Sequence, residues 1–381
     1  MTVSRRTAAM AASRMKSWFP TTTSPLIVSA PMAFVTNVQL ASEVSRVGGL
    51  GFIQGGRDFS AGSPALKKLD EDLSTARQAL KVGGGARDTL PIGVGFVAYP
   101  SSVSEFANTT TPILQSHRPA AVWLFAPSPS APTTIADIIQ SLSSVGGEWG
   151  LKVVVQVGNV AAARQAAEEG AHIIVAQGID AGGHQWASGA SIVSLVPEVA
   201  DMLKTEFPDR EIGLWAAGGI ADGRGVAAAL ALGAEGAVLG TRFMVATESD
   251  TQDYKRQVIL STTDGGATTA KSQIHDHIQG NREWPDVYDG RAVIHPSYQD
   301  QQSGISFEEN EKRFKAAKEA GEVSRMVTWS GTGVGLIKEA LPAADIVQLL
   351  REQTLKVIGP LKQIRRIMRC TGFHPCHAAK A

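Results

Sequence analysis

One short stretch of the chain carries residue types that suit both the binding of a flat ligand and the transfer of a proton. Residues 175–185 read VAQGIDAGGHQ, an apolar run that ends in a polar, glycine-rich loop. The Gln177 amide offers two donors and an acceptor, which suits the polar edge of a heterocycle. Gly182 and Gly183 would let the backbone pass close to that ligand. Imidazole titrates near neutrality, so His184 could act as a general base, although a lone histidine is more often structural.

Two later glycine-bearing turns indicate a phosphate site. One apolar run ends in Gly218-Gly219 and the next ends in Gly240-Thr241. Glycine lets backbone N–H groups approach an anion, and a helix that begins there favours its charge. Either turn alone also fits a simple tight turn. Their positions after the seventh and eighth predicted strands favour phosphate binding, because barrel enzymes usually bind phosphate there.

Eight short apolar runs alternate with helical patterns over the first 240 residues. Most are continuous Val, Ile, Leu and Ala runs, as expected of parallel strands buried on both faces. Asn37, Asn159 and Asp222 stand where helix N-caps are expected, and glycines follow each helical pattern. This rhythm predicts an α/β fold of the TIM (β/α)8-barrel type, with a doubly wound open sheet as the alternative. The predicted strands are 26–30, 50–54, 92–98, 121–126, 152–157, 172–177, 212–216 and 236–239.

The rhythm is lost after Phe243, which predicts a second part of the molecule. Residues 247–304 are polar, and helical patterns return at 307–320, 335–339, 344–354 and 361–368. We expect a smaller, mostly helical lid domain inserted after the eighth strand, over the carboxyl ends of the strands. The expected divisions are a disordered segment at 1–20, the barrel at 21–245, the lid at 246–335, C-terminal helices packing on the barrel at 336–369 and a tail at 370–381.

Several other residues have side chains that could take part in chemistry. Trp284 and Tyr288 are candidates to shield the ligand from water, or else anchors of a loop. His275 and His277 alternate like residues of a strand and predict a solvated face. His172 begins the sixth predicted strand, at the end of the barrel opposite the site, which favours a structural role. Four donors in the tail match no standard zinc spacing, so we predict no metal site; they are Cys370, His374, Cys376 and His377.

Composition narrows the class of partner and compartment. Lysine plus arginine equals aspartate plus glutamate at 36 each, so no net charge draws the chain to nucleic acid or membrane. We expect a small-molecule substrate and a monomer or homodimer. The only two cysteines lie in the tail, which fits a reducing compartment. We expect a cytoplasmic protein without a membrane span; the basic first 20 residues leave a mitochondrial presequence as the alternative.

The ordered set of motifs resembles the nitronate monooxygenase family, formerly called 2-nitropropane dioxygenase, and in particular its fungal branch. The likeness covers most of the chain, from Pro25 to Ile337. Its motifs are SAPM at 29–32, GGLGFI at 48–53, AQGIDAGGH at 176–184, AAGGI at 216–220, LGTRF at 239–243 and WSGTGVG at 329–335. Some bacterial relatives carry an asparagine where this chain has Gly95, so no asparagine role is carried over.

The resemblance implies a non-covalent FMN at the top of the barrel and assigns roles to individual residues. Met32 would lie against the flat ring, since a thioether is polarizable, unless it only fills the top of the barrel. Catalysis falls on His184. The implied ring and ribityl contacts are Ala30, Pro31, Met32, Gln177 and Gly182, beside Gly183. The implied phosphate contacts are Gly219, Val238, Leu239, Gly240 and Thr241, beside Gly218.

The activity that the resemblance implies is oxidative denitrification. Alkyl nitronates would react with dioxygen to give a carbonyl compound and nitrite. Nitroalkanes would react as well if His184 removed the proton that a nitro group acidifies. A protonated His184 would instead stabilise the charge of a nitronate. The alternatives are a flavin-dependent enoyl-acyl-carrier-protein reductase, an FMN oxidase acting on another carbon acid in a biosynthetic pathway, and a flavin-binding protein without turnover.

Overall fold

Eight parallel strands form a barrel in the computed structural model, which describes residues 14–83, 85 and 88–370, with the backbone alone for 360–370. Neighbouring strands follow the order β1-β9-β8-β6-β5-β4-β3-β2. The ring is completed between β1 and β2, where Leu50 N donates to Ile27 O at 2.9 Å. The predicted TIM barrel is therefore confirmed over the open sheet. Its strands are β1 (Leu26–Ser29), β2 (Gly51–Gly56), β3 (Leu90–Val97), β4 (Pro119–Phe125), β5 (Lys152–Val157), β6 (Ile173–Gln177), β8 (Gly213–Ala217) and β9 (Gly236–Leu239).

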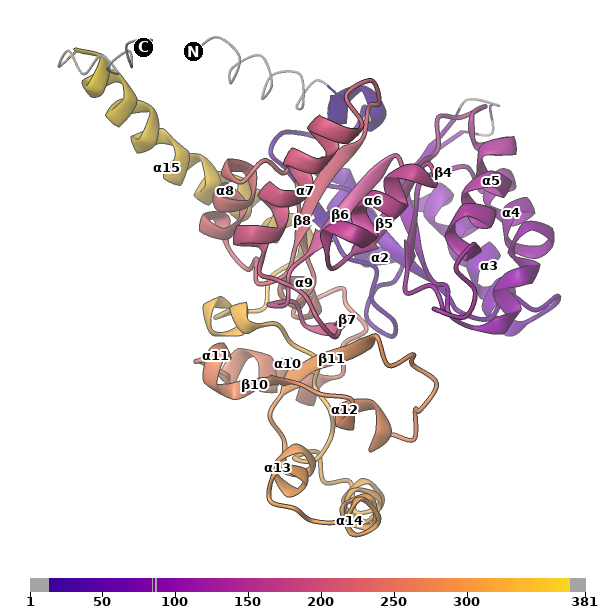
Figure 1. Cartoon of the computed structure of the whole chain (residues 1–381), viewed down its shortest axis with the longest axis vertical. Coiled ribbons are helices and arrows are strands. Elements are labelled where there is room, and N and C mark those ends of the chain that lie inside the picture. Colours follow the sequence, from indigo (N-terminus) through magenta and orange to yellow (C-terminus); the bar gives the residue numbers. More distant parts are fainter. Residues whose placement is uncertain (1–13, 84, 86–87, 371–381) are drawn as a thin grey trace, which may run out of the picture.

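Helices surround the barrel (Figure 1). The three predicted N-caps are confirmed, because the side chains of Asn37 and Asn159 accept hydrogen bonds from Leu40 N and Ala162 N, both at 2.8 Å, and Asp222 also caps its helix. The outer helices are α2 (Val38–Arg46), α3 (Pro64–Ala79), η1 (Ser101–Glu105), α4 (Phe106–His117), α5 (Thr134–Gly146), α6 (Val160–Glu168), α7 (Ile192–Glu206) and α8 (Gly223–Ala231).

The last helix, α15 (Ala343–Cys370), packs against α8 and α2 and so completes the outer ring. Arg351 fastens it by donating to the carbonyls of Val47 and Gly48, both at 2.6 Å. The two helical patterns predicted at 344–354 and 361–368 belong to this one helix. A helix predicted at 335–339 is wrong: η2 (Thr332–Leu336) is a short 3-10 turn, and no helix follows it before α15.

The amino end of the barrel is closed by the start of the chain. Residues 14–18 are helical, and Met15 and Phe19 are buried. Trp215 Nε1 lies 3.3 Å from Met15 Sδ, and the Trp215 ring packs on Phe19 at 6.0 Å. The expectation of disorder over 1–20 is therefore wrong for residues 14–20, since apolar side chains there enter the core. Residues 1–13 lie outside the described part of the chain.

Between β9 and α15 the chain forms a second subdomain at the other end of the barrel (Figure 1). Besides helices, which the sequence predicts, this subdomain contains a three-stranded sheet that the sequence does not predict. Its strand order is β10-β11-β7. One of its strands, β7, comes from the loop after β6, so the second subdomain is not a simple insertion. Its elements are β7 (Gly183–Trp186), α10 (Asp253–Ser261), α11 (Gly265–Thr268), β10 (Thr269–Lys271), α12 (Ile274–His277), β11 (Tyr288–Val293), α13 (Pro296–Gln302) and α14 (Phe307–Glu319).

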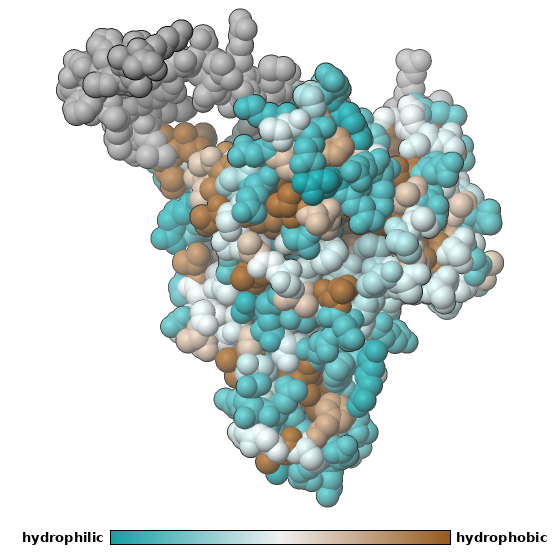
Figure 2. Space-filling model, viewed as in Figure 1, coloured by the Kyte–Doolittle hydropathy of each residue, from teal (hydrophilic) through white to brown (hydrophobic). Residues whose placement is uncertain are grey.

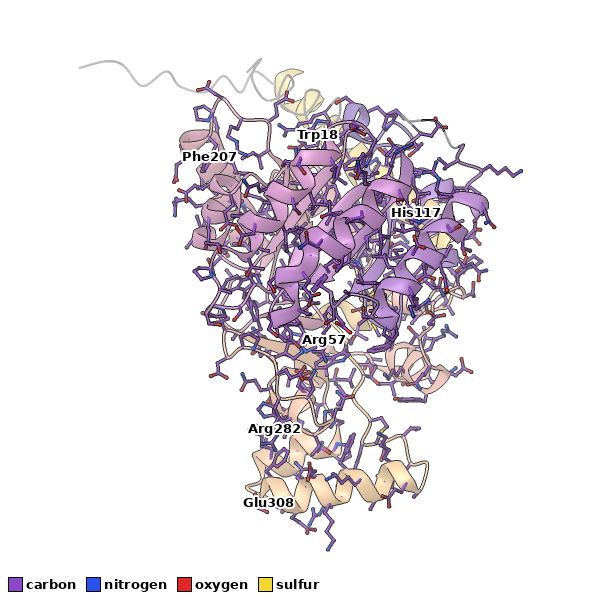
Figure 3. All side chains as sticks on the ribbon, turned by 90° about the vertical axis from the view of Figure 1, so that its right-hand side faces the viewer. Trp18, Arg57, His117, Phe207, Arg282 and Glu308 are labelled. Carbon is purple, nitrogen blue, oxygen red and sulfur yellow. The ribbon has the colours of Figure 1, made fainter. Side chains whose placement is uncertain are left out.

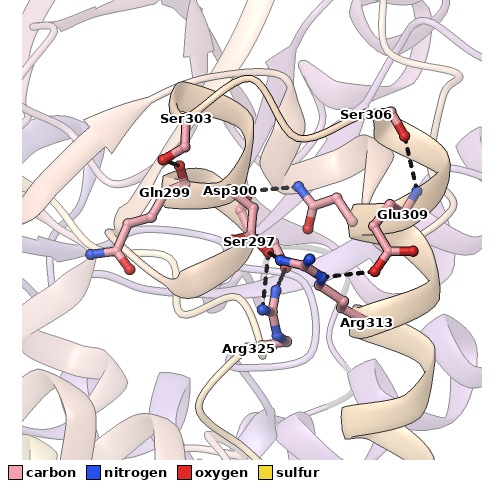
Figure 4. A network of polar contacts seen from close by, with 9 residues as sticks. Ser297, Gln299, Asp300, Ser303, Ser306, Glu309, Arg313 and Arg325 are labelled. Atoms are coloured by element: carbon pink, nitrogen blue, oxygen red, sulfur yellow. Dashed lines mark hydrogen bonds and ion pairs between the residues drawn. The ribbon is translucent and has the colours of Figure 1, made fainter.

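Ion pairs hold the far end of the second subdomain together (Figure 4). Asp300 on α13 accepts from Arg313 on α14 at 3.3 Å and pairs with Arg325 at 3.0 Å. The surface in the view of Figure 2 is mostly hydrophilic, with hydrophobic residues in small scattered groups. Among the described residues, no helix combines the length and apolarity that a membrane crossing requires.

Candidate active site

The residues singled out in the sequence meet at the carboxyl ends of four adjacent strands. β1, β9, β8 and β6 are neighbours in the barrel, and each ends in one of the predicted turns: Ala30-Pro31-Met32 after β1, Gly240-Thr241 after β9, Gly218-Gly219 after β8, and Gln177 at the end of β6. The turns also touch, since Ala30 N donates to Leu239 O at 3.0 Å. The geometry therefore places both halves of the predicted site side by side.

His184 lies outside the barrel strands, on β7 of the second subdomain. Its Nε2 is 2.9 Å and 3.0 Å from the two carboxylate oxygens of Asp276 on α12. The Asp276 side chain is 7% exposed and the His184 side chain 21%. Nothing in the local sequence pattern indicates Asp276, because its contact with His184 spans 92 positions.

Aromatic rings enclose His184. Trp284 stacks on the imidazole, with 3.8 Å between ring centroids and 12° between planes, and Trp329 lies tilted at 4.8 Å. Trp284 also packs on Tyr99 at 4.8 Å, so it links the second subdomain to the barrel. Tyr288 is buried and donates to a backbone carbonyl, and burial raises the pKa of its phenol. Of the two predicted aromatic residues, Trp284 is therefore the one that covers the histidine.

A salt bridge fastens the Trp284 segment to the barrel. Arg57, which follows β2, pairs with Glu283 at 3.2 Å and lies over the Tyr99 ring at 5.7 Å. Figure 3 shows Arg57 at the junction of the barrel and the second subdomain, with Trp18 at the opposite end of the barrel. Burial is the largest effect on Tyr99 and raises the pKa of its phenol, so Tyr99 stays neutral beside the arginine.

A chain of side-chain hydrogen bonds orients Gln177. Trp123 Nε1 donates to Gln156 Oε1 at 3.1 Å, and Gln156 Nε2 donates to Gln177 Oε1 at 2.7 Å. Gln177 Nε2 then donates to the backbone carbonyl of His184 at 3.3 Å. Since an amide nitrogen carries two hydrogens, one N–H of Gln177 remains available to a ligand. The sequence predicted Gln177 at the site but not the two residues that orient it.

The glycines of the site serve different purposes. A Cβ at Gly182 would lie 2.4 Å from Gly331 N, so Gly182 allows close packing against the 330–331 backbone. Gly218 and Gly219 have φ values of +106° and +73°, which side chains rarely adopt. A Cβ at Gly95 would lie 2.4 Å from the Pro31 ring, which explains why no asparagine fits there.

The turns after β8 and β9 retain the donors that a phosphate requires. Over the described ranges, the N–H groups of Gly219, Gly240 and Thr241 donate to no protein acceptor. Gly240, at the start of α9 (Thr241–Met244), leaves open space, since a Cβ there would meet only Met32 Sδ at 3.6 Å. The Thr241 hydroxyl accepts from Gly331 N at 3.1 Å. The donor set fits a bound phosphate, because backbone N–H groups favour anions.

Three other histidines, His172, His275 and His295, are structural. His275 is fully buried on α12, so the prediction of a solvated strand containing it and His277 is wrong. His275 Nε2 donates to Ala270 O at 2.9 Å, so its Nδ1 accepts from His295 Nε2 at 2.9 Å. Burial lowers the pKa of both rings, that of His295 to about 3. His172 Nδ1 accepts from Val153 N at 3.1 Å, which confirms its structural role.

No cluster of three metal-binding side chains occurs among the described residues. Cys370 ends α15, where only the backbone is described. The other three donors in the tail, His374, Cys376 and His377, lie outside the described residues.

Comparisons with known proteins agree with this geometry. A model of the nitronate monooxygenase family matches residues 131–353. A nitronate monooxygenase from Neurospora crassa is 52% identical over 92% of this chain and 95% of its own, and nitronate monooxygenase npaC from Metarhizium robertsii is 33% identical over 89% and 93%. Among solved structures, FabK from Thermotoga maritima has a TM-score of 0.68 at 25% identity, over 92% of this chain and 98% of its own. A nitroalkane oxidase from Streptomyces ansochromogenes, at 22% identity and a TM-score of 0.67 over 91% and 99%, shares the fold.

Fold and site together define a class: flavin-dependent oxidoreductases built on a (β/α)8 barrel. Within that class the chain belongs to the nitronate monooxygenase family, and it resembles fungal members of that family. The family resemblance drawn from the motifs is confirmed.

Proposed function

We propose that the protein oxidises alkyl nitronates with dioxygen to a carbonyl compound and nitrite, with FMN as its cofactor and His184 as its catalytic residue. One observation carries the proposal: His184 is held by Asp276 and Trp284 beside the strand-end turns that suit a flavin phosphate. The relatives that are named nitronate monooxygenases support the substrate class.

The residues that would hold FMN fall into two groups. The free N–H groups of Gly219, Gly240 and Thr241 would bind the phosphate, beside Gly218, Val238 and Leu239. Gln177 would donate its remaining N–H to the polar edge of the ring, beside the Ala30–Met32 turn and the Gly182-Gly183 loop. Bound there, FMN would accept electrons from the substrate and pass them to dioxygen. The second subdomain would serve as a lid, with Trp284 keeping water from the ring.

Two roles for His184 follow from the chemistry of the substrate. With a neutral nitroalkane, the imidazole would take the proton from the carbon next to the nitro group. With a substrate that arrives as a nitronate, no proton needs to be removed, and a protonated His184 would stabilise the negative charge. Asp276 supports either role, because its carboxylate stabilises the cationic ring.

The test measures nitrite release from ethyl nitronate and from nitroethane by the purified flavoprotein and its His184→Asn variant. We expect the released cofactor to be FMN and nitrite to form from nitronate. His184→Asn should lose nitroethane turnover by about 100-fold or more, the usual contribution of a general base. Protein that binds no flavin, or that forms no nitrite from either substrate, would refute the proposal. Rapid bleaching of the flavin by NADPH would favour the enoyl reductase alternative.

A further inference from the structure

We propose that Asp276 is the positioning residue of this site: it holds His184 in the tautomer with hydrogen on Nε2, so that Nδ1 is the atom that takes the substrate proton. The inference deepens the proposed function and rests on it. It also implies that the second subdomain, and not the barrel, selects the reactive atom.

The contact between the two side chains fixes the tautomer. An ionised carboxylate only accepts hydrogen bonds, and both oxygens of Asp276 lie within 3.0 Å of His184 Nε2. Asp276 is almost fully buried, and among the described residues His184 is its only ion-pair partner. A buried carboxylate without a donor is costly, so the hydrogen of a neutral imidazole belongs on Nε2. The lone pair is then on Nδ1.

The surrounding rings keep the imidazole in one plane. Trp284 covers one face at 3.8 Å, and Trp329 packs against the ring at 4.8 Å. Over the described residues, Nδ1 has no hydrogen-bond partner in the protein, and this atom is not fully buried. Nδ1 is therefore open to a ligand, while Nε2 is occupied.

The proton transfer from the nitroalkane to His184 needs no further reactant. The C–H bond next to the nitro group breaks and the Nδ1–H bond forms. The electron pair moves into the C=N bond of the nitronate, and the negative charge settles on the nitro oxygens. The ring becomes an imidazolium paired with Asp276, and no group is oxidised or reduced. When the substrate is supplied as the nitronate, this step is not needed, so Asp276 matters less.

The test compares Asp276→Asn with the wild-type flavoprotein on nitroethane and on ethyl nitronate. The asparagine amide keeps the size of the carboxylate but lacks its charge, and because it offers both a donor and an acceptor it no longer fixes one tautomer. We expect kcat/KM for nitroethane to fall about 100-fold and that for ethyl nitronate to change less than about 5-fold. Asp286→Asn, an exposed position in the same subdomain, is the matched control and should behave as wild type.

A spectroscopic readout on the wild-type enzyme makes the test independent of how the variant folds. In protein labelled with 15N-histidine, the side-chain signals of His184, assigned by their loss in His184→Asn, should show hydrogen on Nε2 and none on Nδ1. The opposite tautomer would overturn the proposal. Equal losses on both substrates in Asp276→Asn, or full nitroethane turnover, would overturn it too. Wild-type protein that makes no nitrite would instead refute the proposed function. The NMR measurement of the tautomer does not depend on nitrite formation, so the two failures can be told apart.

Discussion

Replacing Gln156 with leucine tests whether the hydrogen bonds that join Trp123, Gln156 and Gln177 inside the barrel support the site. Gln156 on β5 is bonded on both sides: its Oε1 accepts from Trp123 Nε1 and its Nε2 donates to Gln177 Oε1. Leucine has a similar size but no polar atoms. The variant therefore removes both bonds and releases the Gln177 amide, which otherwise points its nitrogen at the His184 carbonyl.

The expected cost follows from the groups left without partners. Trp123 is 2% exposed, so its N–H cannot turn to water, and an unsatisfied buried donor costs about 1–3 kcal/mol. Gln177 is only half-buried, so its oxygen adds about 1 kcal/mol, the net value of a typical hydrogen bond. The sum is a loss of about 2–4 kcal/mol in the free energy of unfolding. Flavin affinity should also fall, because Gln177 is no longer oriented.

Urea denaturation followed by tryptophan fluorescence measures the first effect, and flavin titration of the apoprotein measures the second. Gln165→Leu is the matched control: Gln165 is exposed on α6, and among the described residues its side chain bonds only to Glu169. Surface changes of this kind usually stay within about 0.5 kcal/mol. If Gln156→Leu unfolds at the same urea concentration as Gln165→Leu and binds flavin as tightly as wild type, the reasoning is refuted.

Three further predictions concern packing and pH. Gly182→Ala should lower the free energy of unfolding by about 1–3 kcal/mol and reduce nitrite formation, since its Cβ would lie 2.4 Å from backbone. Gly304→Ala, between α13 and α14, has free space and a φ of +80°, so this control should show only backbone strain in urea denaturation, with normal activity. Arg351→Ala should lower thermal stability by about 2–4 kcal/mol, because it releases α15 from four backbone carbonyls; an unchanged melting temperature would contradict this. Burial lowers the pKa of His172 from 6.5 to about 4, so the unfolded chain binds the proton first and stability falls as the pH drops between those values. His172→Gln should flatten that slope in urea titrations from pH 4 to 7, and a parallel slope would contradict the assignment.

The barrel could be predicted from the sequence because its strands are buried on both faces. Such strands appear as continuous apolar runs, and the predictions for 152–157 and 236–239 coincide with β5 and β9. The strands of the second subdomain lack this signature. β7 reads Gly-His-Gln-Trp and pairs with β11, where Gly290 faces His184. A pairing over more than 100 positions leaves no local pattern to read.

The sequence predicts which residues belong to the candidate site, but it does not predict their surroundings. Motif order located His184 and Gln177, whereas Asp276 and Gln156 reach them only through the folded structure. The interpretation of His275 failed for a related reason. Its neighbours alternate like a strand, but α12 is a single helical turn that buries one histidine and turns Asp276 toward the site.

Under the proposed function, the position of His184 makes the second subdomain part of the chemistry and not only a cover. The barrel contributes one bond to this residue, from Gln177 to its carbonyl. The side chain itself is held by Asp276 and Trp284, and its strand pairs with β11, all from the segment between β9 and α15. Replacing that segment would therefore change the surroundings of His184, its tautomer and the face open to substrate together. Among barrel enzymes with the same phosphate-binding turns, we expect the choice of carbon-acid substrate to depend on α12 and on the loop that carries Trp284. We do not expect it to depend on the barrel strands.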